Sequence, residues 1–191
     1  MSDIQNEKNE LRNKVLSERQ GIDEGAWKIK SETIIAKLID LDSFERALLV
    51  HTYISMNERR EVCTDALIEY LFKSKKSVAA PITNFSDNTL SHSMITNFKD
   101  LSSNKWGVRE PNELIPVDTT KIDLVVVPMA AADRSGNRLG YGKGFYDGFL
   151  SQINSVKVGL IFKEFLFEEI PVEEFDVKLE IIVTDDEVIF T

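Results

Sequence analysis

The stretch that decides the fold of this chain is IDLVVVPMAAADRSGNRLGYGKGFYDGFL, residues 122–150. Residues 122–128 form the most continuous apolar run, which predicts a central strand that is buried on both faces. After Pro128, five of the chain's nine glycines fall within thirteen residues, at positions 136, 140, 142, 144 and 148. Residues 145–153 then carry apolar side chains at helical spacing. The stretch therefore predicts a buried strand, a glycine-rich loop and a helix, in that order.

The glycine-rich loop also carries two cations, Arg138 and Lys143. Glycine lets the backbone pass close to a ligand, and a strand, a cationic glycine-rich loop and a helix N-terminus together can bind phosphate. The pattern differs from a P-loop because Gly144 follows the lysine, and the glycines alternate as G-x-G-x-G rather than G-x-G-x-x-G. The loop predicts a nucleotide or phosphate site; a glycine-rich hairpin with incidental charges is the alternative.

Outside this stretch, segments with helical periodicity alternate with short β-branched runs. Helices are predicted over 4–20, 25–40 and 61–73, and strands over 47–55, 77–82, 156–162 and 180–190. Residues 83–120 mix Ser, Asn and isolated aromatics and are predicted to be irregular. The alternation predicts one α/β domain over residues 1–191, with three Rossmann-like layers: a largely parallel sheet and helices on both faces. In such sheets ligands bind beyond the carboxyl ends of the strands, where the glycine-rich loop begins.

Composition excludes several classes of function. The 23 Lys and Arg and 32 Asp and Glu give a net charge of −9 without a basic block, which excludes general nucleic-acid binding. The only cysteine, Cys63, can form no internal disulfide or thiolate zinc cluster. His51 and His92 match no metal-ligand spacing. Signal-peptide and membrane-spanning patterns are lacking, so a cytoplasmic protein without a membrane partner is expected, and a monomer is favoured.

The motif RLGYGKGFYDGFL, residues 138–150, follows a strand, a proline and Asp133-x-x-Gly136. It resembles the signature P-x-x-A-x-D-x-x-G-x-R-L-G-x-G-x-G-[YF]-Y-D of the 5-formyltetrahydrofolate cyclo-ligase family, also called methenyltetrahydrofolate synthetase. Further segments fit in the family's order: Lys8-x-x-Leu11-Arg12, Tyr53 to Met56 with Glu61-x-x-Thr64, Trp106 with Glu110-Pro111, and Ile170-Pro171 through Thr184-Asp185. The resemblance thus covers nearly the entire chain.

The resemblance implies an enzyme that uses ATP as co-substrate, together with Mg²⁺, to convert 5-formyltetrahydrofolate into 5,10-methenyltetrahydrofolate. Phosphorylation of the formyl oxygen would turn a poor leaving group into a good one, and N10 would then close the ring and expel phosphate. Positioning and charge neutralisation carry most of the catalysis in phosphoryl transfer.

By position, the resemblance also implies the site residues. The ATP site would comprise Lys8, Arg12, Arg138, Leu139, Gly140, Tyr141, Gly142, Lys143, Gly144, Phe145 and Tyr146. The folate site would comprise Met56, Glu61, Trp106, Tyr141, Gly142, Lys143, Gly144 and Phe145. The expected catalytic residues are Arg138, Lys143 and Tyr146, and the expected Mg²⁺ ligands are Asp147 and Asp185, with Asp186 open as an alternative to Asp185.

Each role has a structural alternative. Lys8 and Arg12, four residues apart on a helix, could form a solvated face, and Glu61 could be a carboxylate at a helix N-terminus. Met56 and Trp106 could belong to the core, and Phe145 could pack its helix onto the sheet.

Three positions depart from the family pattern: Ala132, Gly148 and Phe165. They favour, as an alternative function, a non-catalytic nucleotide- or folate-binding module on the same fold. A sugar-phosphate isomerase or acyltransferase on a similar layered fold is a further alternative, and an isomerase would release no ADP.

Overall fold

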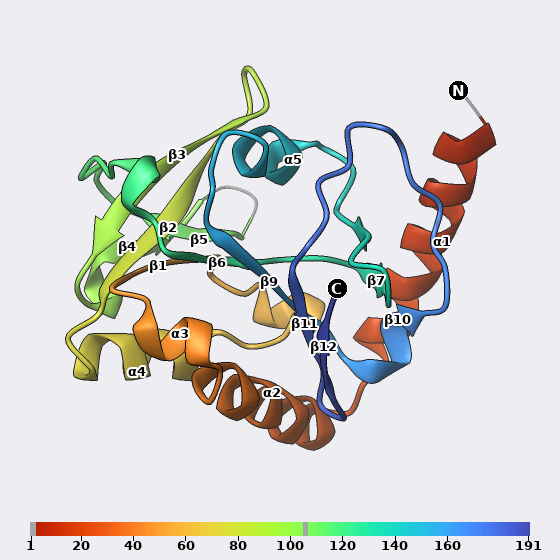
Figure 1. The fold of residues 1–191 in the computed structure, drawn as a ribbon, viewed down its shortest axis with the longest axis horizontal. Coiled ribbons are helices and arrows are strands. Elements are labelled where there is room, and N and C mark those ends of the chain that lie inside the picture. Colours follow the sequence, from red (N-terminus) through yellow and green to blue (C-terminus); the bar gives the residue numbers. More distant parts are fainter. Residues whose placement is uncertain (1–2, 105–106) are drawn as a thin grey trace.

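A central seven-stranded sheet organises residues 3–104 and 107–191, the part of the chain that the computed structural model describes (Figure 1). Its strand order is β12-β11-β9-β6-β1-β2-β3. The neighbours from β11 to β2 pair in parallel, and the edge strands β12 and β3 are antiparallel. The strands are β1 (Leu49–Thr52), β2 (Ser77–Asn84), β3 (Thr89–Ile95), β6 (Leu124–Val127), β9 (Val156–Leu160), β11 (Ile181–Val183) and β12 (Val188–Phe190).

The other strands of the described residues form two smaller sheets. One has the order β10-β7-β8, and the other pairs β4 with β5. Their strands are β4 (Leu101–Ser103), β5 (Arg109–Pro111), β7 (Ala131–Asp133), β8 (Arg138–Leu139) and β10 (Leu166–Phe167).

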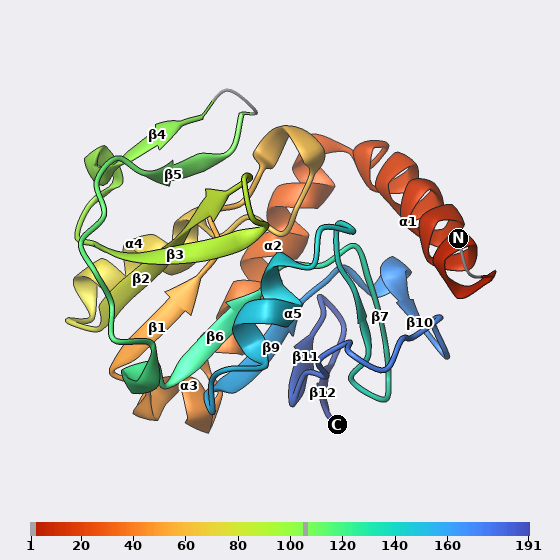
Figure 2. The same cartoon turned by 90° about the horizontal axis from the view of Figure 1, so that it is seen from above.

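Helices cover both faces of the central sheet: α2, α3 and α4 lie on one face, and α5 lies on the other (Figure 1). The helices are α1 (Asp3–Gln20), α2 (Glu24–Ile39), α3 (Asp42–Arg46), α4 (Asp65–Lys73) and α5 (Phe145–Leu150). Both views place α1 beside β7 and β10, away from the other helices (Figures 1 and 2). The predicted α/β class, with a largely parallel sheet between helices, is confirmed. No helix of the described residues is long and apolar enough to span a membrane.

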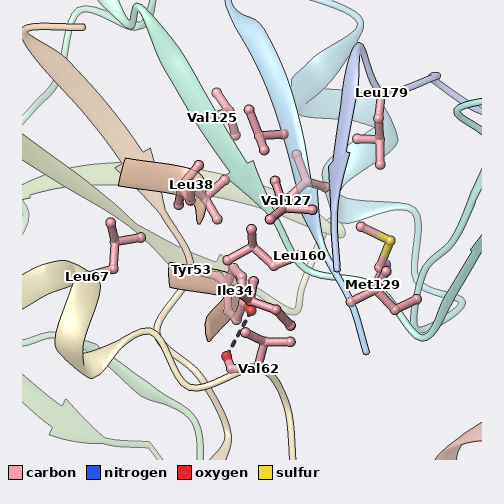
Figure 3. Close-up of a cluster of buried hydrophobic side chains, with 14 of the residues drawn as sticks. Ile34, Leu38, Tyr53, Val62, Leu67, Val125, Val127, Met129, Leu160 and Leu179 are labelled. Carbon is pink, nitrogen blue, oxygen red and sulfur yellow. Dashed lines mark hydrogen bonds between the residues drawn. The ribbon is translucent and has the colours of Figure 1, made fainter. Parts of the chain in front are cut away.

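The core lies between α2 and the parallel strands. The N-terminus of α2 is capped by Asp23, whose carboxylate accepts hydrogen bonds from the N–H groups of residues 25 and 26 at 2.9 and 3.1 Å. Figure 3 shows Ile34 and Leu38 of this helix close to Val127 of β6, and the two helix residues are fully buried. Burial of each such side chain contributes about 1.5–3 kcal/mol. All four residues of β6 are buried, and β6 is the middle strand of the sheet, as predicted for the apolar run.

Several boundaries differ from the prediction. Residues 83–120, predicted to be irregular, contain the whole of β3 and the β4–β5 pair. The sequence of β3, TLSHSMI, is mostly polar because β3 is a half-exposed edge strand, and pairing with β2 stabilises it. The predicted strand over 180–190 is an antiparallel hairpin, in which Thr184 accepts hydrogen bonds from two N–H groups of the turn.

The predicted helices over 61–73 and 145–153 are shorter in the structure. Helix α4 begins only at Asp65, because Glu61 and Thr64 are buried and their side chains bond the backbone of Met56 and Ser55. Helix α5 ends at Leu150.

Candidate active site

The glycine-rich segment leaves the carboxyl end of β6 and forms the antiparallel β7–β8 hairpin before it reaches α5. Asp133 holds its turn, because the carboxylate accepts hydrogen bonds from the N–H groups of Ser135 and Asn137 at 2.9 and 3.1 Å. Gly136 has a φ of +85°, and a Cβ at this position would lie 2.6 Å from the carbonyl oxygen of Leu179. Asp133 and Gly136 of the signature therefore shape the loop.

Helix α1 supplies Arg12 to this loop. Its Nε donates a hydrogen bond to the carbonyl oxygen of Gly140 at 2.8 Å. Gly142 has a φ of +85°, and a Cβ there would lie 3.1 Å from the Arg12 guanidinium carbon. Partial burial lowers the pKa of Arg12, while Asp176 opposes this effect. Arg12 is thus packed on the backbone of the glycine-rich loop.

Lys8, one turn before Arg12 on α1, lies in an acidic cluster. Its Nζ contacts the carboxylates of Glu173 and Asp176 at 2.8 and 2.5 Å, and its side chain is 6% exposed. Gln5 donates to Glu173 as well. The contact ties α1 to the segment that precedes β11, so Lys8 is not on a solvated face.

Arg138 and Asp147, predicted for phosphate and metal binding, are paired with each other. Arg138 Nη2 lies 2.5 Å from Asp147 Oδ1, and the Arg138 side chain is only 2% exposed. Asp147 Oδ1 also accepts from the N–H of Val177 at 3.2 Å. Lys143, in contrast, is exposed next to Gly144, the left-handed residue that precedes α5.

Asp185, the other predicted metal ligand, contacts different residues from Asp147. Its carboxylate accepts from the N–H of Lys163 at 2.8 Å and pairs with Lys30 of α2 at 3.3 Å. Asp186 is exposed. The carboxylates of Asp147 and Asp185 thus have separate protein partners, and the described residues contain no group of three or more His, Cys, Asp or Glu side chains arranged for a metal ion.

Glu61 lies in a pocket at the carboxyl ends of β1, β6 and β9. It is 3% exposed, and its Oε2 accepts a hydrogen bond from the N–H of Met56 at 2.7 Å. Burial raises the pKa of the Glu61 carboxyl, while the Met56 N–H opposes this shift. Arg19 of α1 and Tyr141 of the loop line the same pocket. The structure therefore brings α1, the glycine-rich loop and Glu61 together.

Tyr146 of α5 faces a cluster of rings. Its hydroxyl is buried without a partner among the described residues, and burial raises its pKa. The His51 ring lies 6.4 Å from the Tyr146 ring, and His51 Nε2 lies 3.0 Å from His92 Nδ1. The two histidines, which are 41 positions apart in the sequence, are therefore neighbours in the structure.

The remaining predicted residues differ in burial and in their contacts. Leu139 is buried, Met56 is half-buried, and Phe145 packs edge-to-face on Phe85 with ring centroids 5.9 Å apart. Trp106 lies outside the described residues.

Sequence inspection missed Arg19, which is 3% exposed. A signal was present, because Arg19 stands four residues after buried Val15 and so continues the apolar face of α1. It also missed Glu173 and Asp176, which lie far along the chain from their partner Lys8 and in a stretch with the composition of a solvated surface.

A mainly parallel sheet, with a cationic glycine-rich segment and a buried carboxylate at the carboxyl ends of its strands, places the chain among α/β proteins that bind a small molecule at that edge. The model of the 5-formyltetrahydrofolate cyclo-ligase family matches residues 4–185. The chain belongs to this family and is an enzyme.

Individual relatives agree with this assignment. A probable 5-formyltetrahydrofolate cyclo-ligase of Schizosaccharomyces pombe is 34% identical over 84% of this chain and 86% of its own length. The 5-formyltetrahydrofolate cyclo-ligase of Mus musculus is 27% identical over 82% of this chain and 83% of its own. The solved structure of Aquifex aeolicus 5,10-methenyltetrahydrofolate synthetase superposes with a TM-score of 0.85 at 31% identity, covering 96% of this chain and 92% of that one.

Proposed function

We propose that this enzyme converts 5-formyltetrahydrofolate into 5,10-methenyltetrahydrofolate and consumes ATP in the presence of Mg²⁺. The observation that carries the proposal is the family match over residues 4–185, which includes both the glycine-rich segment and the Glu61 pocket. In the proposed reaction the formyl oxygen attacks the γ-phosphorus and ADP leaves. N10 then attacks the formyl carbon and gives up its proton, the C–O bond breaks, and phosphate leaves with that proton.

The cations near the glycine-rich loop suit the triphosphate. Arg12 packs on the loop backbone, and Arg138 keeps a buried Nε without a protein partner among the described residues. Exposed Lys143 can reach a ligand without breaking a buried contact. In the proposed site Arg138 and Lys143 stabilise the charge that spreads over the γ-phosphoryl group in the transition state. Lys8 would have to exchange its contact with Glu173 or Asp176 for phosphate.

Asp147 suits one Mg²⁺ ligand position, because both of its hydrogen bonds use Oδ1 and leave Oδ2 for a ligand. Asp185 is the proposed second carboxylate, and it would share its charge between the metal and Lys30. Mg²⁺ commonly binds one or two carboxylates together with phosphate oxygens and water, and it would neutralise charge on the triphosphate.

The folate would lie between Glu61 and α5. Glu61 keeps an unpartnered Oε1 to accept a hydrogen bond from the pterin ring. Met56, beside it, together with Tyr141 and Phe145, would supply wall contacts. The Tyr146 hydroxyl is protonated at neutral pH, and burial raises its pKa further, so it can donate a hydrogen bond at the reacting formyl group.

The test follows the methenyl absorbance band and phosphate release in parallel, with purified protein, ATP, Mg²⁺ and 5-formyltetrahydrofolate. Growth of the band with one phosphate per methenyl group supports the proposal. Binding of ATP and folate without a band would favour the non-catalytic module. Band growth without ADP would contradict the ATP requirement.

A further inference from the structure

An exposed phenylalanine, Phe175, lies beside a cation of α1. The residue is 68% exposed, and Lys8 Nζ lies 6.0 Å from the centre of its ring. Phe175 belongs to a short turn, in which the carboxylate of Asp176 accepts a hydrogen bond from the N–H of Glu173 at 2.7 Å. The N–H of Asp176 donates in return to the carbonyl oxygen of Glu173 at 3.1 Å, and both side chains pair with Lys8. The turn is therefore fixed to α1 and presents an aromatic ring to solvent.

Helix α1 places three cationic side chains in a row along the candidate site. Arg19 lines the Glu61 pocket, and Arg12, seven residues earlier, packs on the glycine-rich loop. Lys8 stands four residues before Arg12, beside Phe175. With 3.6 residues per turn, the three positions lie within about 40° of one another around the helix axis, and the rise of 1.5 Å per residue separates them by about 10 and 6 Å. The row therefore runs in one direction, from the Glu61 pocket past the loop to Phe175.

The proposed reaction fixes which way the nucleotide points along this row. The γ-phosphorus must lie next to the formyl oxygen of the folate, because reacting atoms have to be close and aligned. The proposed folate position is at the Glu61 end of the row. The rest of the nucleotide must therefore extend away from Glu61, past Arg12 and the glycine-rich loop, toward Lys8. The base then reaches the surface at which Phe175 is exposed.

We infer that the ring of Phe175 is the surface on which the adenine base of ATP stacks. This inference rests on the proposed ATP-dependent function of the enzyme. Single exposed apolar side chains are common on protein surfaces, but this ring stands at the end of a row of cations that suits a triphosphate. A base gains affinity by stacking on an aromatic side chain. Because α1 already holds the turn, binding would order little beyond the ring itself.

The test compares equilibrium binding of ATP and of methyl triphosphate, each with Mg²⁺, by titration calorimetry. Methyl triphosphate carries the same phosphate chain without ribose or base. The wild type should bind ATP at least about tenfold more tightly, the scale of one stacked base. Phe175→Leu keeps an apolar side chain but no ring, so its ATP affinity should fall about tenfold while its affinity for methyl triphosphate stays unchanged. Phe175→Trp keeps an aromatic face and should retain the tighter binding of ATP.

Phe190→Leu is the matched control, because Phe190 is 72% exposed on β12, at an edge of the central sheet, and its replacement should change neither affinity. Unchanged ATP binding in Phe175→Leu overturns the inference. Equal weakening of both ligands overturns it as well, because that result would indicate a disturbed Lys8 rather than a lost stack. If the variants fail to fold, equal binding of the two ligands by the wild type still contradicts stacking. Failure of the wild type to bind either ligand would instead contradict the proposed use of ATP.

Discussion

Lys143 and Arg138 are both cations of the glycine-rich segment, but they differ in what surrounds them. Arg138 is buried against Asp147, so its loss would unpair a carboxylate and perturb the fold as well as the chemistry. Lys143 is exposed, so its removal isolates the effect of its charge on a ligand.

Lys143→Ala should lower kcat about 100-fold, on the scale of losing one transition-state donor, while thermal unfolding stays near that of the wild type. Steady-state kinetics with the methenyl band as readout would measure this change. Lys121→Ala is the matched control, because that side chain is 76% exposed in an i,i+3 pair away from the loop. Wild-type turnover in Lys143→Ala would remove Lys143 from the catalytic set.

His51 and His92 form a buried pair whose lowered pKa values make the stability of the fold depend on pH. Burial lowers the pKa of His92 to about 4. Burial first, and the charge of His92 second, lower the pKa of His51 well below its ordinary value. Both rings contact Phe149 of α5, with centroids 5.0 and 4.1 Å away. The folded protein therefore holds a neutral imidazole pair beneath α5.

Acid should weaken the fold through this pair. The folded pKa values lie below the unfolded value of about 6.5, so the unfolded chain binds protons first as the pH falls. The stabilisation is fully present above about pH 6.5 and is lost between that pH and the folded pKa.

Urea unfolding of the wild type and of His92→Gln at pH 7 and pH 5 measures this loss of stability. Between pH 7 and pH 5 the free energy of unfolding should fall by about 1–2 kcal/mol less in His92→Gln than in the wild type, a range that already includes a discount for the partial exposure of His92. Equal losses would show that the pair does not couple to folding.

At the scale of elements, the β7–β8 hairpin depends on the backbone of Gly136. The left-handed φ and the nearby carbonyl oxygen of Leu179 leave no room for a methyl group. Gly136→Ala should therefore destabilise the protein by about 2 kcal/mol or more, since strain and overpacking add. Chemical denaturation would measure the change.

Gly148 is the matched control in the adjacent helix α5. A Cβ at Gly148 would have open space, and its φ is in the ordinary range. Gly148→Ala should be neutral or should stabilise the protein by about 0.5–1 kcal/mol, as expected for alanine in a helix. If both variants were destabilised equally, the steric explanation for Gly136 would be wrong.

Elements with a strong local pattern were predictable from sequence. Helix α2 was expected over 25–40 and spans Glu24–Ile39, because its apolar face and its cap are encoded within one segment. Strand β3 was missed because its polar sequence favours a strand only when β2 supplies hydrogen-bond partners. The site divides in the same way. Residues of the glycine-rich signature are adjacent in sequence, whereas Lys8 meets Asp176 across 168 positions, which no local pattern reveals.

At the scale of the whole molecule, the candidate site is assembled from distant parts of the chain. Helix α1 contributes Arg12 and Arg19, the short 3-10 helix η1 (Asn57–Arg59) is followed by Glu61, and the segment after β6 contributes the loop. Figures 1 and 2 show α1 beside β7, at the edge of the molecule rather than packed on the central sheet. A ligand that bridges these parts would therefore join α1 to the rest of the fold, and binding should stabilise the protein globally.

ATP with Mg²⁺, and separately 5-formyltetrahydrofolate, should each raise the unfolding temperature. A ligand at 100 times its Kd adds about 2.7 kcal/mol, which corresponds to a shift of roughly 5–11 °C for a domain of this size. Differential scanning calorimetry over a series of ligand concentrations measures this shift in unfolding temperature.

Lys143→Ala should lose much of the ATP shift but retain most of the folate shift, because the Glu61 pocket is intact. A folate shift without any ATP shift in the wild type would contradict the nucleotide site. Stabilisation by ATP that was equal in the wild type and Lys143→Ala would place the nucleotide away from the exposed end of the glycine-rich loop.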